Sequence, residues 1–163
     1  MKVNNILNII NVIILTFISP SLLAASNGVL ELKGVIPLIN QISVETQPLA
    51  QNIDIPNGTE GTIAVATEIS NNRDGYNIQI YSYNGGQLVH QLNSSYKVSY
   101  QLSYANGSFF VPGTSSNPTQ VKNISVLNEL TTSTSNINIK TIPNNNTVSG
   151  NYNDTIVITI TAN

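Results

Sequence analysis

Few residues of this sequence have the types and spacing that chemistry requires. The single histidine, His90, lies in the run Leu88-Val89-His90-Gln91, whereas a catalytic histidine needs a nucleophile or metal partner and an orienting group. The chain has no cysteine, and no serine stands in a recognisable nucleophile motif. We therefore predict that His90 is an ordinary strand or loop residue and that the chain is not an enzyme.

The acidic residues do not form a recognisable metal site either. Sites built from histidine and cysteine are excluded by count. Asp74 and Asp154 lie near Asn-rich turns, but neither belongs to the Asp-rich run of a calcium-binding loop. Both are better interpreted as turn residues whose carboxylates accept hydrogen bonds from backbone N–H groups. We expect no metal and no cofactor.

Charge and the first residues indicate where the protein works. Eight acidic and six basic residues give a net charge of −2, so no basic face exists for a nucleic-acid backbone. A short polar start with Lys2, an apolar run at residues 6–18 and small residues up to Ser26 follow the order of a secretory signal peptide. We predict a signal peptide at residues 1–25. The alternative is a membrane anchor, but the apolar run is short and Asn8 and Asn11 interrupt it.

Two alternating runs stand near the two ends of the sequence. In residues 150–161, Ile156, Ile158 and Ile160 point to one side and mostly threonines to the other, which predicts a half-buried strand. Only two residues follow it, so we expect the chain to end on a core strand. In residues 29–36 the apolar face consists of Leu30, Leu32, Gly34 and Ile36, with Glu31 and Lys33 opposite and Pro37 as the terminator.

The elements between these runs are also short alternating strands separated by turn residues. We predict strands at residues 38–44, 62–69, 76–83, 87–92, 96–104, 108–111, 123–127 and 136–142. In residues 62–69 we expect Ile63, Val65, Thr67 and Ile69 to point inward. Asp74-Gly75 predicts a hairpin to the next strand, because glycine adopts a positive φ freely. The pattern predicts an all-β, immunoglobulin-like antiparallel β-sandwich, with a barrel as the second choice.

Tyrosines are concentrated in two of these strands. Tyr76, Tyr81 and Tyr83 occupy one, and Tyr96, Tyr100 and Tyr104 the other. They could form a sugar-binding or adhesive face, or they could pack in the core. Because Tyr96, Tyr100 and Tyr104 alternate on one face with Val98 and Leu102, we favour core packing.

Three stretches together resemble subunits of pili that a periplasmic chaperone and an outer-membrane usher assemble. They are the N-terminal alternating run closed by Val35-Ile36-Pro37, the central turn and strand Asp74-Gly75-Tyr76-Asn77-Ile78, and the ending Gly150-Asn151-Tyr152-Asn153-Asp154 with its alternating isoleucines. The likeness is closest to the alpha-fimbrial major subunits and to the related spore coat U domain. It covers nearly all of the chain after the signal peptide, as a pattern rather than as identities. The disulfide common in pilins is missing here, because the chain has no cysteine.

The resemblance implies an incomplete sandwich at residues 38–163 and a donor-type strand at residues 26–37. Leu30, Leu32, Gly34 and Ile36 would enter the groove of a neighbouring copy. That groove would be lined by Ile156, Ile158 and Ile160 and by an early strand around residues 39–44. The implied partners are copies of the chain itself, a periplasmic chaperone and an outer-membrane usher, and the implied location is the fimbrium at the cell surface.

Two functions are therefore expected from this sequence. The first is a structural fimbrial subunit that polymerises by donor-strand exchange. The alternative is a self-complemented secreted adhesin or surface-matrix protein, in which residues 26–37 fold into their own sheet and the domain binds a carbohydrate or a protein. Polymerisation distinguishes the two, because the second protein would be monomeric.

Overall fold

The structure is a computed structural model that describes residues 28–144 and 147–163. The predicted signal peptide at residues 1–25 lies outside the described residues. The chain divides into two units, Met1–Val35 and Ile36–Asn163. In the described part, no helix is long and apolar enough to cross a membrane.

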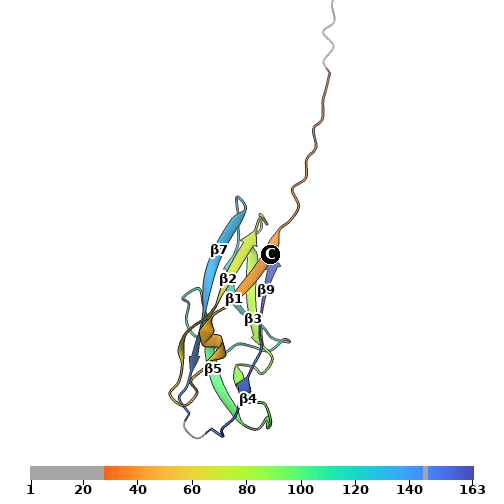
Figure 1. The fold of residues 1–163 in the computed structure, drawn as a ribbon. Coiled ribbons are helices and arrows are strands. Elements are labelled where there is room, and N and C mark those ends of the chain that lie inside the picture. The colour runs from red at the N-terminus through yellow and green to blue at the C-terminus, as the bar shows by residue number, and fades with distance from the viewer. Residues whose placement is uncertain (1–27, 145–146) are drawn as a thin grey trace, which may run out of the picture. The chain divides into compact units, whose positions relative to one another are not determined.

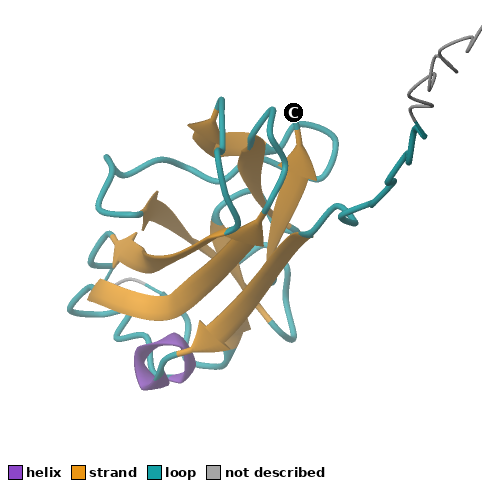
Figure 2. Ribbon diagram, turned by 90° about the horizontal axis from the view of Figure 1, so that it is seen from above, coloured by secondary structure: helices purple, strands orange, loops and turns teal. Residues whose placement is uncertain are grey.

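The described residues of the second unit form two antiparallel sheets (Figure 1 and Figure 2). The larger has six strands in the order β1-β2-β7-β5-β4-β8, and the smaller has three in the order β6-β3-β9. The strands are β1 (Asn40–Thr46), β2 (Glu60–Ser70), β3 (Tyr76–Ser82), β4 (Gln87–His90), β5 (Lys97–Tyr104), β6 (Thr119–Ile124), β7 (Thr131–Thr141), β8 (Tyr152–Asn153) and β9 (Ile156–Ala162), with one 3₁₀ turn, η1 (Pro48–Gln51). The predicted all-β antiparallel class is confirmed.

The core lies between the two sheets. Ile78 and Ile80 of β3 and Leu102 of β5 are fully buried, and Ile137 of β7 is 1% exposed. Tyr76, Tyr100 and Tyr104 are buried in this core, which confirms the predicted core packing for Tyr100 and Tyr104. The prediction is wrong for Tyr96, which lies just before β5 and is exposed, as is Tyr83.

The predicted inward face of β2 is wrong beyond Ile63. A β-bulge between Thr62 and Ala64 shifts the register with β7 and reverses the alternation, because one extra residue exchanges the two faces of a strand. Ala64, Ala66, Glu68 and Ser70 are therefore the buried residues, while Val65, Thr67 and Ile69 are half-buried on the other face. The buried face therefore carries the carboxylate of Glu68, whereas the predicted inward residue was Ile69.

The predicted hairpin at Asp74-Gly75 is also wrong. β2 and β3 do not pair, because β2 belongs to the six-stranded sheet and β3 to the three-stranded sheet. The turn instead carries the chain from one sheet to the other. Gly75 has φ +81°, and a Cβ there would lie 1.8 Å from the carbonyl oxygen of Ile124, so close approach as well as turn geometry requires glycine.

Several other boundaries differ from the predicted ones. The strand predicted at residues 38–44 is β1, which begins two residues later. The strand predicted at residues 123–127 overlaps only the end of β6. Residues 108–111 form an isolated bridge between Phe110 and Leu102. The strand predicted at residues 29–36 is not observed, because alternation makes a stable strand only where a neighbouring edge supplies hydrogen bonds.

Candidate functional site

The candidate site lies between β1 and β9, which run side by side in Figure 1. Each is the outermost strand of its sheet: among the described residues, β1 pairs with β2 and β9 pairs with β3, and neither has a second partner. An edge strand leaves every second backbone N–H and C=O without a ladder hydrogen bond. Two such edges therefore face a common groove.

The first half of this groove is a hollow that opens onto the core. Its volume is about 310 Å³, and Ile156 and Ile158 of β9 face Val44 and Thr46 of β1 across it. The floor consists of core residues of the larger sheet, namely Ile63, Ala64, Leu88, Tyr100, Ile137 and Ile139. These floor residues are buried, whereas Val44 on the rim is 46% exposed and Ile156 and Ile158 are only partly buried.

A second hollow follows the other half of the groove. It has a volume of about 540 Å³ and is lined by residues 40–43 of β1, by Ile158, Thr159 and Ile160 of β9, and by Thr67 and Ile69 of β2. The inward isoleucines Ile156, Ile158 and Ile160 remain only partly buried, although they pack against the core. The structure thus brings the three predicted acceptor residues and the early strand to one groove.

The beginning of β9 is held by Asp154. Its Oδ2 accepts hydrogen bonds from the hydroxyls of Ser82 (2.7 Å) and Tyr100 (2.8 Å). Its Oδ1 accepts from the backbone N–H groups of Asn84 (3.1 Å) and Thr155 (2.7 Å), which is the turn role predicted for it. Burial, with the nearby Asp154 charge, raises the pKa of Tyr100, so this hydroxyl remains a donor. The groove therefore has one polar, fixed end.

His90 holds the residues that lead into β8. Its Nδ1 accepts hydrogen bonds from the backbone N–H groups of Leu92 and Asn93 (both 3.2 Å), so the ring proton is assigned to Nε2, which donates to the carbonyl of Ser149 (3.3 Å). The ring also packs edge-on against Tyr152, with centroids 5.0 Å apart. Its contacts connect the residues around β4 and β8.

We predict that Gly150→Ala destabilises the domain by about 3 kcal/mol, from a strained backbone and overpacking. A Cβ at this position would lie 2.0 Å from His90 Nε2, and Gly150 has φ +148°. Gly85→Ala is the matched control, because Gly85 also has a positive φ (+61°) but its nearest neighbour would be 3.6 Å away; it should cost only about 1 kcal/mol. Urea unfolding of both variants measures the difference, and equal losses would contradict tight packing against His90.

Glu68, which the sequence analysis placed on an outer face, is the most densely bonded side chain of the core. Its carboxylate accepts from Tyr76 OH (2.6 Å), Tyr104 OH (2.5 Å) and Lys122 Nζ (2.7 Å). The hydroxyls of Ser133 (3.1 Å) and Ser135 (2.8 Å) complete the set. The only signal in the sequence was that Glu68 is the one acid of the predicted strand at residues 62–69, whose other residues are apolar or carry hydroxyls.

Hydrogen bonds keep the Glu68 carboxylate ionised. Burial acts to raise the pKa of Glu68, but hydrogen bonds from Lys122, Tyr104, Tyr76 and Ser135 outweigh it and hold the pKa below its usual value. Burial and the bond to Glu68 raise the pKa of Tyr76 to about 12. Glu68 comes from the larger sheet, whereas Tyr76 and Lys122 come from the smaller one. The cluster therefore connects the two sheets.

The predicted donor residues are exposed. Leu30, Leu32 and Ile36 keep 82%, 84% and 86% of their surface accessible, and a Cβ on Gly34 would meet nothing within 4 Å. Residues 28–39 form no strand. Their role as donor residues stays a prediction.

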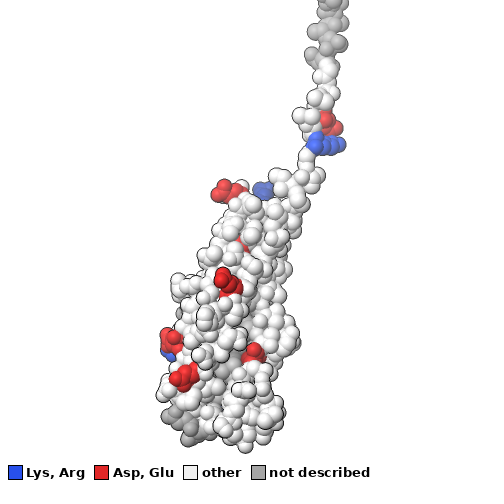
Figure 3. Space-filling model, in the orientation of Figure 1, with Lys and Arg blue, Asp and Glu red and all other residues white. Residues whose placement is uncertain are grey.

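Comparison with known proteins assigns no family to this chain. No family model matches it, and no curated protein matches it. Within residues 28–144 and 147–163, no group of three or more His, Cys, Asp or Glu side chains is placed to hold a metal ion. Charged side chains are also sparse on the face that Figure 3 shows. The groove is therefore the feature on which a functional proposal can be built.

Proposed function

We propose that this chain is a structural fimbrial subunit that polymerises by donor-strand exchange. Residues 26–37 of one copy would fill the β1–β9 groove of the next, and this head-to-tail contact would repeat without closing, which generates a filament. One observation carries the proposal: the groove lies between two strand edges that have no partner among the described residues, and it opens onto the core.

The chemistry of the N-terminal segment fits that groove. In β-strand addition, main-chain hydrogen bonds supply affinity and alternate side chains enter pockets. Leu30, Leu32 and Ile36 present large aliphatic groups at two-residue spacing, with Gly34 between them. The alternating run has eight residues, which span about 26 Å as a strand, and β9 has seven. The segment thus matches the groove in both periodicity and length.

The groove in the free chain is narrower than a strand requires. Some Cα atoms of β1 and β9 lie within 8 Å of one another, whereas a strand between them needs about 9.5 Å. Insertion therefore moves β1 outward. β1 is suited to this movement, because it is held on one edge alone by β2 in the described part of the chain.

The finer description of the fold belongs to the same proposal. We interpret the two-sheet sandwich as an immunoglobulin-like domain of pilin type, which lacks one strand until a neighbour supplies it. By resemblance, the chain would be secreted through the periplasm, held there by a chaperone and assembled at the cell surface by an outer-membrane usher. The sparse charge and the resemblance support this assignment together with the groove.

Deleting residues 26–37 tests the proposal. The chain that begins at residue 26 should form polymers, whereas the chain that begins at residue 38 should remain monomeric and should bind a synthetic peptide of residues 27–37. Light scattering and analytical ultracentrifugation measure the first result, and fluorescence anisotropy of a labelled peptide measures the second.

Two outcomes would contradict donor-strand exchange. If both chains are equally stable monomers and the peptide does not bind, the groove is not an acceptor. If the longer chain is a monomer and loses stability when residues 26–37 are removed, the self-complemented secreted protein is the better assignment.

A further inference from the structure

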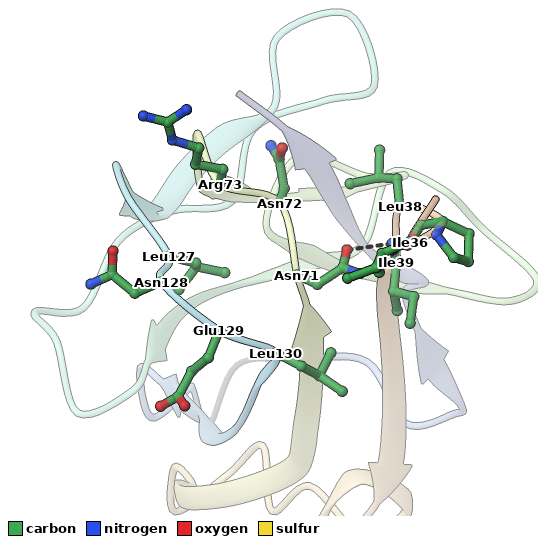
Figure 4. Close-up of a pocket in the computed structure, with 11 residues that line it drawn as sticks. Ile36, Leu38, Ile39, Asn71, Asn72, Arg73, Leu127, Asn128, Glu129 and Leu130 are labelled. Atoms are coloured by element: carbon green, nitrogen blue, oxygen red, sulfur yellow. Dashed lines mark hydrogen bonds between the residues drawn. The ribbon is translucent and has the colours of Figure 1, made fainter. Parts of the chain in front are cut away.

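A third, largely apolar hollow lies where the N-terminal segment leaves the domain (Figure 4). We call it the exit hollow. Its volume is about 630 Å³, and it is lined by residues 36–39 ahead of β1, by residues 71–73 of the β2–β3 turn and by residues 127–130 ahead of β7. In Figure 4 the side chains of Leu127 and Leu130 lie on one side and those of Leu38 and Ile39 on the other.

Large aliphatic side chains around this hollow are exposed to solvent. Leu38 keeps 62% of its surface accessible, Leu130 57% and the neighbouring Val126 61%. A cluster of exposed aliphatic side chains around one hollow is typical of a contact surface, whereas single exposed aliphatic residues are common. The exit hollow therefore has the composition of an interface.

The backbone at the exit is held in a fixed position by Asn71. Its Oδ1 accepts from the N–H of Ile39 (2.7 Å), and its Nδ2 donates to the carbonyl of Pro37 (2.8 Å). The N–H of Asn71 also donates to the carbonyl of Ile39 (3.1 Å). Residues 37–39 thus leave the domain in one direction, set by hydrogen bonds on both sides of Leu38.

We propose that the exit hollow is a second contact between successive copies of this chain, distinct from the strand in the groove. This inference rests on the proposed function. Ile36 is both the last predicted donor residue and part of the hollow's wall. When Ile36 enters a neighbour's groove, only one or two residues of chain separate the exit hollow from that neighbour. This length is about 3.5 to 7 Å. The occupant is therefore a second copy.

Strand direction identifies which part of the second copy is in contact. All pairings between the named strands are antiparallel, and antiparallel pairing is slightly more stable per residue. A donor antiparallel to β9 places Ile36 beside Ile156, at the beginning of that strand. A hollow lined by residues 52–56 and 147–150 shares Ile53 with the hollow that Ile156 lines. It includes Ile53, Ile55 and the exposed Val148, which are apolar partners for Leu130.

Cross-linking tests this contact directly, because the native chain has no cysteine. A chain carrying Leu130→Cys is mixed with one carrying Val148→Cys, polymerised and oxidised. We expect disulfide-linked dimers from this pair. The matched pair of Val111→Cys with Val148→Cys should give none, since Val111 is equally exposed (56% against 57%) but does not line the exit hollow. Absence of the first cross-link in polymers, or equal cross-linking of both pairs, would overturn the proposal.

A charge in the hollow gives an independent measurement that separates this proposal from strand exchange. In the full chain, Leu130→Asp should raise the critical concentration for polymerisation by about tenfold or more, because the carboxylate loses water at the contact. Val111→Asp should leave it unchanged. The chain that begins at residue 38 should bind the peptide of residues 27–37 with the same affinity whether or not it carries Leu130→Asp. If the peptide binds and Leu130→Asp polymerises normally, the second contact is wrong; if the peptide fails to bind either chain, strand exchange itself is wrong.

Discussion

Replacing Leu32 by aspartate is expected to abolish polymerisation while the domain remains folded. Leu32 lies at the centre of the apolar face of residues 29–36, and its side chain is 84% exposed in the free chain, so the folded domain does not depend on it. In a neighbour's groove, loss of a buried leucine removes about 2 kcal/mol. A carboxylate without a partner in that apolar hollow costs at least about as much again. Together these changes weaken the contact by about a thousandfold.

Lys33→Asp is the matched control for Leu32→Asp. Lys33 lies on the opposite face of the segment, and its ion pair with Glu31 (3.2 Å) joins two side chains that are 80% and 73% exposed, so losing that pair changes little. Light scattering should show polymers for Lys33→Asp and none for Leu32→Asp. The Leu32→Asp chain should still bind a peptide of residues 27–37 in its own groove. Polymerisation of both variants at the same concentration would rule out Leu32 as a donor residue.

Replacing Glu68 by glutamine is expected to lower the free energy of unfolding by about 3 kcal/mol, as for other broken buried ion pairs. The side chain of Glu68 is fully buried, and that of Lys122 is 21% exposed. Without the carboxylate, the Lys122 charge loses its partner. The NH2 group of the new glutamine also cannot accept a hydrogen bond from the hydroxyls that surround it. Glu60→Gln in the same strand is the control: the Glu60–Lys140 pair (2.8 Å) is 57% and 48% exposed, and its loss should cost less than about 0.5 kcal/mol. Urea unfolding at neutral pH compares the two.

The native chain and Glu68→Gln should also differ in how their free energy of unfolding depends on pH. The pKa of Glu68 is lower in the folded chain than in the unfolded chain. Its contribution to stability is therefore complete above the unfolded pKa of about 4.5 and is lost as pH falls below that value. The stability difference between the native chain and Glu68→Gln should be constant from neutral pH down to about 5.5 and should shrink at lower pH. A difference that grew on acidification would contradict an ionised Glu68.

Alternation in the sequence located most strands because period two is a property of neighbouring residues. β5, β7 and β9 were predicted for this reason, as was the all-β antiparallel class. Alternation could not reveal the bulge between Thr62 and Ala64, because an inserted residue leaves the local composition unchanged while reversing the inward face. Nor could it show that Asp74-Gly75 joins two sheets, since the turn residues are the same in a hairpin and in a crossover.

The candidate site was predictable in part for the same reason. Ile156, Ile158 and Ile160 share a face in any strand, and the structure places them beside β1; their role as acceptor residues stays a prediction. The two hollows depend on which strands become neighbours, and this is set by contacts between residues far apart in the sequence. Glu68 illustrates the limit. Its partners come from β3, β5, β6 and β7, so no local pattern distinguishes it from a surface acid.

The Asn71 hydrogen bonds at the start of β1 have a mechanical consequence. In the proposed filament under tension, the pull on residue 37 would enter the domain at these bonds and would run lengthwise along β1. The neighbour's strand would lie alongside β1 and β9, so the load would act parallel to the strands and would be shared by many hydrogen bonds at once. Such shear loading resists rupture better than peeling, in which the bonds break one after another. The sandwich core, including the Glu68 cluster, would stay outside this load path and would remain folded while the filament is stretched.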